Sequence, residues 1–173
     1  MVQATKTVEK IVEAIQALDL DPIKVKLMDA EEGQGWSREY VDRMETDYKR
    51  FLTLLVKFPQ ETIAPSKDVD KFWHGHILDT MKYAEDCERV FGYFLHHFPY
   101  FGMRGADDAA DLRAAAERMS ALYDQEFGAH ATAGTAWCMA AKPAQADSAW
   151  CMAAKPSRVS IDVNVRPSLD AVN

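Results

Sequence analysis

The spacing of apolar residues is the feature that most constrains the fold of this chain. Through the first 128 residues, apolar side chains recur every three or four positions, which is the spacing that lines one face of an α-helix. In the first helix that we expect, over residues 5–18, these side chains are Val8, Ile11, Val12, Ile15 and Leu18. The pattern therefore predicts an all-α protein.

Capping residues and prolines divide this region into further helices. Ser37 can cap a second helix that stops at Pro59, because a serine hydroxyl accepts a hydrogen bond from a free amide of the first turn. Ser66 can cap a third helix that begins at Lys67 or Asp68. These starts and stops depend on local chemistry alone, so we expect them to hold in the folded protein.

A last helix is expected from about residue 107 to 127, with Gly128 as its stop. We expect residues 19–36 to form a loop with at most a short turn of helix. Three residues interrupt the helical pattern there: Pro22, Gly33 and Gly35. The expected fold is a small helical bundle of about four to five helices.

The amino-acid composition of the chain changes after Gly128. Residues 129–173 are rich in Ala, Ser, Thr and Pro, and they carry four basic and three acidic residues, a net charge of 4 − 3 = +1 out of −7 for the whole chain. Few large apolar side chains are left to form a core. We therefore expect a helical domain over residues 1–128 and a disordered tail over residues 129–173.

Charge, hydropathy and cysteine content limit the class of protein. A net charge of −7 disfavours a nucleic-acid partner, which requires clustered Lys and Arg. No apolar stretch reaches the ~20 residues of a membrane span, and the N-terminus lacks the basic start of a signal peptide. Three cysteines are an odd number for a disulfide framework. We expect a cytoplasmic protein without a membrane partner, and its oligomeric state stays open.

Histidines are concentrated in one part of the chain. Residues 66–105 contain four of the five histidines, a density that suggests a site for Fe, Cu or Zn. His74 and His76 lie about 200° apart on a helical wheel, so they cannot bind one ion from a regular helix. Asp70 and His74 have the i, i+4 spacing of a chelating pair.

Three further candidate ligands follow. His76 and Cys87 lie on one polar seam of the wheel, while His97 is ~31 Å away along a continuous helix and could join them only if the chain turns back near Gly92. The alternative for His76 is a buried ring hydrogen-bonded to Asp79 or Tyr83, with no metal. The alternative for Cys87 is a small buried apolar side chain that is neither a ligand nor a nucleophile. The candidate metal ligands are Asp70, His74, His76, Cys87 and His97.

This part of the chain resembles the bacterial members of the glycine-rich domain-containing protein-like family. The resemblance covers roughly residues 20–128 and is based on a Trp-His-x-His motif with residues at helical intervals around it. These residues are Asp70, Trp73, His74, His76, Thr80, Tyr83 and Cys87. The resemblance implies a helical domain but no particular reaction. The glycine-rich segment of the family name is missing, because the chain contains only 8 glycines.

The tail contains the sequence AWCMAAKP twice, at residues 136–143 and 149–156. A reactive unit repeated behind a folded domain is organised like the precursor of a ribosomally synthesised, post-translationally modified peptide. The domain would then be a leader, and a partner enzyme, such as an oxidase encoded nearby, would modify both octamers before the product is exported. The expected modification sites are Trp137, Cys138, Trp150 and Cys151.

Other interpretations of the whole chain stay open. One is a metal-dependent oxidase or cyclase that acts on its own tail or on a small molecule, and another is a metal-binding or interaction protein. The repeat itself could be an inert duplication, a regulatory disulfide, or a Cu(I) clip made by the two cysteines with Met139 and Met152. Residues 159–165 alternate like a strand, which could add to the sheet of a modifying enzyme.

Overall fold

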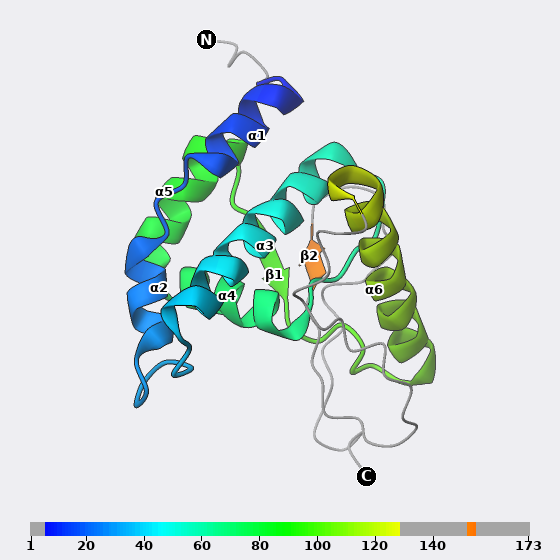
Figure 1. The fold of residues 1–173 in the computed structure, drawn as a ribbon. Coiled ribbons are helices and arrows are strands. Elements are labelled where there is room, and N and C mark those ends of the chain that lie inside the picture. Colours follow the sequence, from blue (N-terminus) through cyan, green and yellow to red (C-terminus); the bar gives the residue numbers. More distant parts are fainter. Residues whose placement is uncertain (1–5, 129–151, 155–173) are drawn as a thin grey trace. The chain divides into compact units, whose positions relative to one another are not determined.

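The protein is described here by a computed structural model that covers residues 6–128 and 152–154. Nearly all of the regular secondary structure in these residues is helical, which confirms the predicted all-α class (Figure 1). The elements, in chain order, are α1 (Val8–Gln16), α2 (Asp21–Met28), α3 (Arg38–Lys57), α4 (Lys67–Leu78), α5 (Thr80–Phe91), β1 (His96–Phe98), α6 (Ala106–Phe127) and β2 (Met152–Ala154).

Several predicted helix ends are confirmed. The Ser37 hydroxyl accepts a hydrogen bond of 3.2 Å from the Tyr40 amide and caps α3. α4 begins at Lys67, as predicted. α6 ends at Phe127, and Gly128 is its C-cap with a positive φ of 85°, a conformation that glycine adopts without steric cost. Local capping residues therefore mark the start of α3 and the end of α6.

The prediction of a loop over residues 19–36 was wrong in its first half. Residues Asp21–Met28 form α2, with Pro22 in the first turn. Proline is favoured there, because the first amides of a helix have no intrahelical acceptor and the ring fixes a helical φ. Pro22 thus marks a helix start, not a break.

The chain from Lys67 to Phe91 forms two helices separated at Asp79. The backbone of Asp79 has φ −81° and ψ 74°, and its carboxylate accepts a hydrogen bond of 3.3 Å from the Lys82 amide. Asp79 is therefore the N-cap of α5. This break and the added α2 explain why the described residues form six helices rather than four to five.

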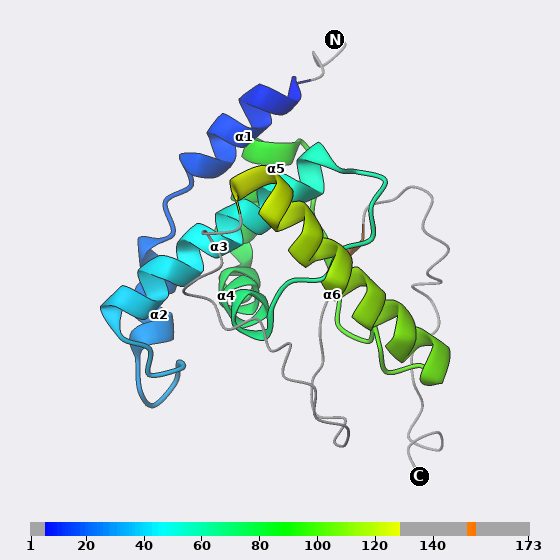
Figure 2. The same cartoon turned by 45° about the vertical axis from the view of Figure 1, so that its right-hand side comes forward.

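The chain divides into two compact units, the first made of residues up to Pro59 together with Asp68–Leu95. Its core lies where α3 and α4 meet, and both views show these helices side by side (Figures 1 and 2). The rings of Tyr48 and Phe72 lie 5.2 Å apart, and those of Phe51 and Trp73 lie 5.5 Å apart. Helices α1 and α2 also contact α3, and α1 contacts α5.

The second unit comprises Gln60–Lys67 and the described residues from His96 onward. Its buried apolar cluster joins the 60–67 segment, β1 and α6, and consists of Ala64, Phe98, Phe101, Leu112 and Ala115. The Ala64 amide donates to the Ala115 carbonyl at 3.3 Å. An ion pair of 2.5 Å between Arg118 and Glu61 joins the same two segments. This cluster holds β1 against α6.

The two strands form an antiparallel pair within this second unit. The register pairs His96 with Ala154, His97 with Ala153, and Phe98 with Met152. β2 lies inside the second AWCMAAKP octamer, a part of the chain that was predicted to be disordered. The strand predicted over residues 159–165 lies outside the described residues. None of the described helices has the length and apolar content needed to cross a membrane.

Candidate metal centre

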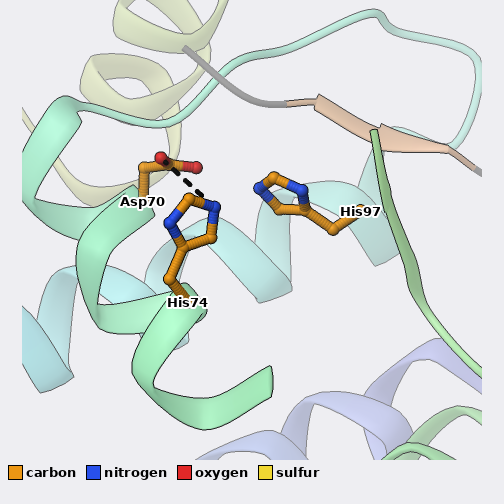
Figure 3. Close-up of side chains that lie close together, drawn as sticks. All are labelled: Asp70, His74 and His97. Atoms are coloured by element: carbon orange, nitrogen blue, oxygen red, sulfur yellow. Dashed lines mark ion pairs between the residues drawn. The ribbon is translucent and has the colours of Figure 1, made fainter. Parts of the chain in front are cut away.

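Asp70 and His74 lie one helical turn apart on α4. The carboxylate oxygen Oδ2 of Asp70 is 3.7 Å from Nε2 of His74 (Figure 3). Asp70 is buried, while His74 exposes 46% of its side chain. The i, i+4 spacing thus places an acidic and an imidazole ligand side by side, as the sequence predicts.

His97 lies on β1, just after the chain has turned back. α5 ends at Phe91, and its C-cap Gly92 has a left-handed conformation with φ 74°, so the helix stops where the sequence analysis placed a turn, although His97 does not join His76. The Leu95 carbonyl, two residues before His97, accepts a hydrogen bond of 2.5 Å from the Tyr83 hydroxyl. This bond fixes the chain that leads into β1.

The ligand atoms of Asp70, His74 and His97 all lie within 4.8 Å of one another (Figure 3). Two imidazole nitrogens and a carboxylate oxygen are a ligand set that suits Zn, Fe and Cu. Three protein ligands leave at least one coordination position for water or another molecule. The group could therefore hold a metal ion.

His76 is placed elsewhere, in the core of the first unit. Its Nδ1 is 3.0 Å from the Tyr48 hydroxyl and its Nε2 is 3.0 Å from the Asp86 carboxylate. Burial lowers the pKa of His76 and outweighs the opposite effect of Asp86, so the neutral ring is favoured. Because both ring nitrogens have protein partners, His76 fits the alternative of a bonded core histidine.

The partners of His76 differ from the expected ones. Asp86 and Tyr48 bind the ring, while Tyr83 contributes an edge contact with the ring centroids 4.9 Å apart. Burial opposes ionisation of Asp86, but hydrogen bonds from Lys82 and His76 outweigh it and lower the pKa of Asp86. The carboxylate is therefore kept charged. Sequence reasoning missed Asp86 because the break at Asp79 changes which faces of α4 and α5 meet.

Cys87 is also buried, with 2% of its surface exposed. Burial raises the pKa of its thiol, so the reactive thiolate is disfavoured. Among the described residues, Cys87 is not part of the group formed by Asp70, His74 and His97. Its environment fits a small buried apolar side chain.

Tyr83 and Trp73 form a buried polar contact that sequence reasoning did not identify. The indole Nε1 of Trp73 donates to the Tyr83 hydroxyl at 2.9 Å, and that hydroxyl donates to the Leu95 carbonyl. The contact thus links α4 to the chain that precedes β1. Tyr83 was named in the sequence motif, but nothing local indicates its partners.

A groove of about 540 Å³ lies beside His74 in the first unit. Its walls come from α2, the loop after α2, and α4, which explains why the sequence, interpreted with a loop in place of α2, gave no sign of it. The lining residues include Ile23, Leu27, Lys71, His74 and Leu78. The apolar walls and the imidazole could receive a small molecule.

The predicted modification sites lie outside the described residues. They are Trp137, Cys138, Trp150 and Cys151. Of the second octamer, the structure describes only the Met152–Ala154 strand. Modification of the octamers therefore stays a prediction.

Comparison with known proteins places the chain in a family. Neither the curated proteins nor the solved structures that were compared gave a match. A protein-family model described as UCP032817-like matches residues 11–121. The matched part includes Asp70, His74 and His97 and ends before the octamers, and the resemblance to the glycine-rich domain-containing protein-like family stays a prediction beside it. Because the match spans more than half of the 173 residues, the chain belongs to the UCP032817-like family.

Proposed function

We propose that the protein binds one Fe, Cu or Zn ion through Asp70, His74 and His97. The observation that carries the proposal is the closeness of one carboxylate and two imidazoles, with their ligand atoms within 4.8 Å of one another. The burial of Asp70 adds support, because a buried carboxylate is stabilised by a nearby positive charge. The groove that His74 helps to line would place a small molecule beside one of the three ligands.

Metal analysis tests the proposal directly. Full-length protein purified without chelator should contain close to one equivalent of metal by elemental analysis. Asp70→Asn, His74→Ala and His97→Ala should each lower the content, since each removes one ligand atom. His96→Ala is the matched control, because His96 is the neighbour of His97 on β1 and is not in the group.

Further variants separate this ligand set from the wider one suggested by the sequence. His76→Gln and Cys87→Ala should keep the metal, because both side chains lie outside the group. In thermal unfolding, added Zn²⁺ should stabilise the wild type and leave the triple variant of the three ligands unchanged. Full metal content in the triple variant would overturn the proposal, as would a wild type that binds none of the three metals.

We also propose that the octamers are cores of a modified peptide, with Trp137, Cys138, Trp150 and Cys151 as the modified residues. The observation that favours this second function is the pairing of β2 with β1, since it brings one octamer to a strand of the folded part. A partner enzyme, such as an oxidase, would act on the tail in the cytoplasm, where thiols stay reduced.

Intact-mass measurement tests the second function. Protein made in its native host, or together with its neighbouring genes, should show a mass change that occurs up to twice. Cys138→Ser should remove one increment and leave the other. If the purified protein acquires the change with metal and oxygen alone, the chain is a self-modifying oxidase. The proposal would be contradicted, for a partner enzyme and for self-modification alike, if Cys138 and Cys151 of the protein from its native host were unaltered and still reacted with a thiol reagent.

A further inference from the structure

We infer that β1 is a docking strand for the sequence AWCMAAKP, and that the two copies are interchangeable occupants that bind one at a time. The inference goes beyond metal binding and modification and requires neither of them. It starts from one observation, the antiparallel pairing of β1 with β2, in which His97 lies opposite Ala153. β2 is the Met-Ala-Ala of the second octamer.

β1 is positioned by contacts that do not involve β2. Phe98 is 5% exposed and is buried with Phe101, Leu112 and Ala115. A two-stranded ladder of three residues is too small to be stable alone. The folded part therefore supplies a preformed edge, to which an extended segment adds by backbone hydrogen bonds.

The ladder cannot distinguish the two octamers. Main-chain hydrogen bonds are the same for any residue other than proline, and the letters on both sides of Met-Ala-Ala are identical in the two copies. A Lys-Pro follows Met-Ala-Ala in both copies, and proline has no amide hydrogen with which to extend a ladder. Met139–Ala141 thus carries every feature with which Met152–Ala154 binds.

The chain is long enough to bring either copy to β1. Phe98 and Ala115 belong to one cluster, and Phe127 lies 12 residues beyond Ala115 on α6, which is ~18 Å along the helix axis. From Phe127 to Ala140 the chain has 13 residues, which can span up to ~43 Å. The first copy can therefore reach the strand with length to spare.

Tether length favours neither copy strongly. Ala140 lies 13 residues after Phe127 and Ala153 lies 26 residues after it, a twofold difference in loop length. Loop closure then favours the first copy by only about threefold. The structure has the second copy in place, so the modest advantage of the shorter tether does not exclude the copy that lies farther along the chain. In each octamer the Cys directly precedes the Met that pairs with β1. If the two copies exchange on β1, the two cysteines would take this position in turn.

Amide hydrogen exchange on the full-length protein tests the inference, with chelator present so that metal has no part. The signal is the protection of the peptide that contains His96–Phe98. Two prolines block each copy: Ala140→Pro with Ala141→Pro in the first, and Ala153→Pro with Ala154→Pro in the second. Ala144→Pro with Ala146→Pro, in the spacer between the octamers, is the matched control.

Each blocked copy alone should leave the protection within about threefold of the wild type, because the other copy takes its place. Blocking both copies should remove the protection, and a synthetic octapeptide AWSMAAKP should restore it. The serine in that peptide prevents oxidation and leaves the ladder unchanged. If blocking only the second copy removed all of the protection, the two copies would not be interchangeable. Unchanged protection with both copies blocked, or no rescue by the peptide, would overturn the docking strand itself.

Discussion

His76 and Asp86 are hydrogen-bonded at 3.0 Å across the break between α4 and α5. The other ring nitrogen of His76 is bonded to Tyr48 on α3, so one side chain joins three helices. A neutral ring satisfies both contacts, because Nε2–H donates to the carboxylate and Nδ1 accepts from the phenol. Protonation of His76 would disturb this arrangement inside the core.

Acid should therefore destabilise the protein through His76. Because burial lowers the pKa of His76 in the folded state, the unfolded chain binds the proton more readily. The free energy of unfolding should then fall as the pH drops below about 6.5, the ordinary pKa of histidine. Urea unfolding at several pH values measures the slope. His76→Gln should flatten it and His96→Gln should not. An equal slope in both variants would contradict the assignment.

Tyr83→Phe should be more destabilising than its small change in volume suggests. The hydroxyl accepts from Trp73 Nε1 at 2.9 Å and donates to the Leu95 carbonyl at 2.5 Å, so its removal leaves two buried groups without this partner. We expect a loss of about 2 to 4 kcal/mol in the free energy of unfolding. Tyr40→Phe, which removes one half-buried bond to Asp68, should cost less in the same urea titration.

The predicted parts of the fold are those fixed by neighbouring residues. The helices that were predicted follow from apolar spacing, and the ends at Ser37 and Gly128 follow from capping residues that act within one turn. Asp70 and His74 come together for the same reason, since four residues make about one turn. Local rules therefore give the helices over residues 8–16, 38–57 and 106–127, the start of α4, and two of the three proposed ligands.

The parts that were missed depend on contacts between distant segments. The partners of His76 are ten residues away on α5 and 28 residues away on α3, and the break at Asp79 defeats a continuous helical wheel. The pairing of β1 with β2 joins segments of three residues each, which are too short for a period-2 pattern. Pro22 misled the prediction of α2 because proline both breaks helices and starts them.

Lys24 should be a main contributor to the packing of α2 on α3. Its Nζ lies 2.7 Å from Asp21, 3.1 Å from Asp42 and 2.8 Å from Glu45. Burial works against the charge of Lys24, but the three carboxylates outweigh it and raise its pKa. Lys24→Met should lower the free energy of unfolding by about 1 to 2 kcal/mol, since the carboxylates then repel one another. Lys26→Met, at an exposed pair, should change it little.

The salt dependence of the Lys24→Met effect distinguishes charge repulsion from lost packing as its cause. Repulsion among the carboxylates should weaken as ionic strength rises, because salt screens charges that are partly exposed. The difference between Lys24→Met and the wild type should therefore shrink in high salt. A difference that does not depend on salt would indicate lost packing of the lysine stem instead.

Gly102 and Gly92 offer a matched test of backbone strain against steric clash. Both have a positive φ, of 90° and 74°, so alanine should be strained at either position. A Cβ at Gly92 would meet no atom within 4 Å, whereas a Cβ at Gly102 would lie 2.5 Å from Cδ2 of Leu112. Gly92→Ala should therefore cost about 1 kcal/mol of unfolding free energy, and Gly102→Ala about 2 to 4 kcal/mol.

The second variant also has a local consequence. The Gly102 amide donates to the Asp108 carboxylate at 2.7 Å, and the Arg104 amide donates to it at 3.1 Å, so movement of Gly102 should loosen the start of α6. Amide exchange in residues 106–109 should rise in Gly102→Ala and stay constant in Gly92→Ala. Adding Leu112→Ala to Gly102→Ala removes the clashing atoms, so the two changes together should cost less than the sum of their separate effects. Additive costs would show that Leu112 is not the source of the strain.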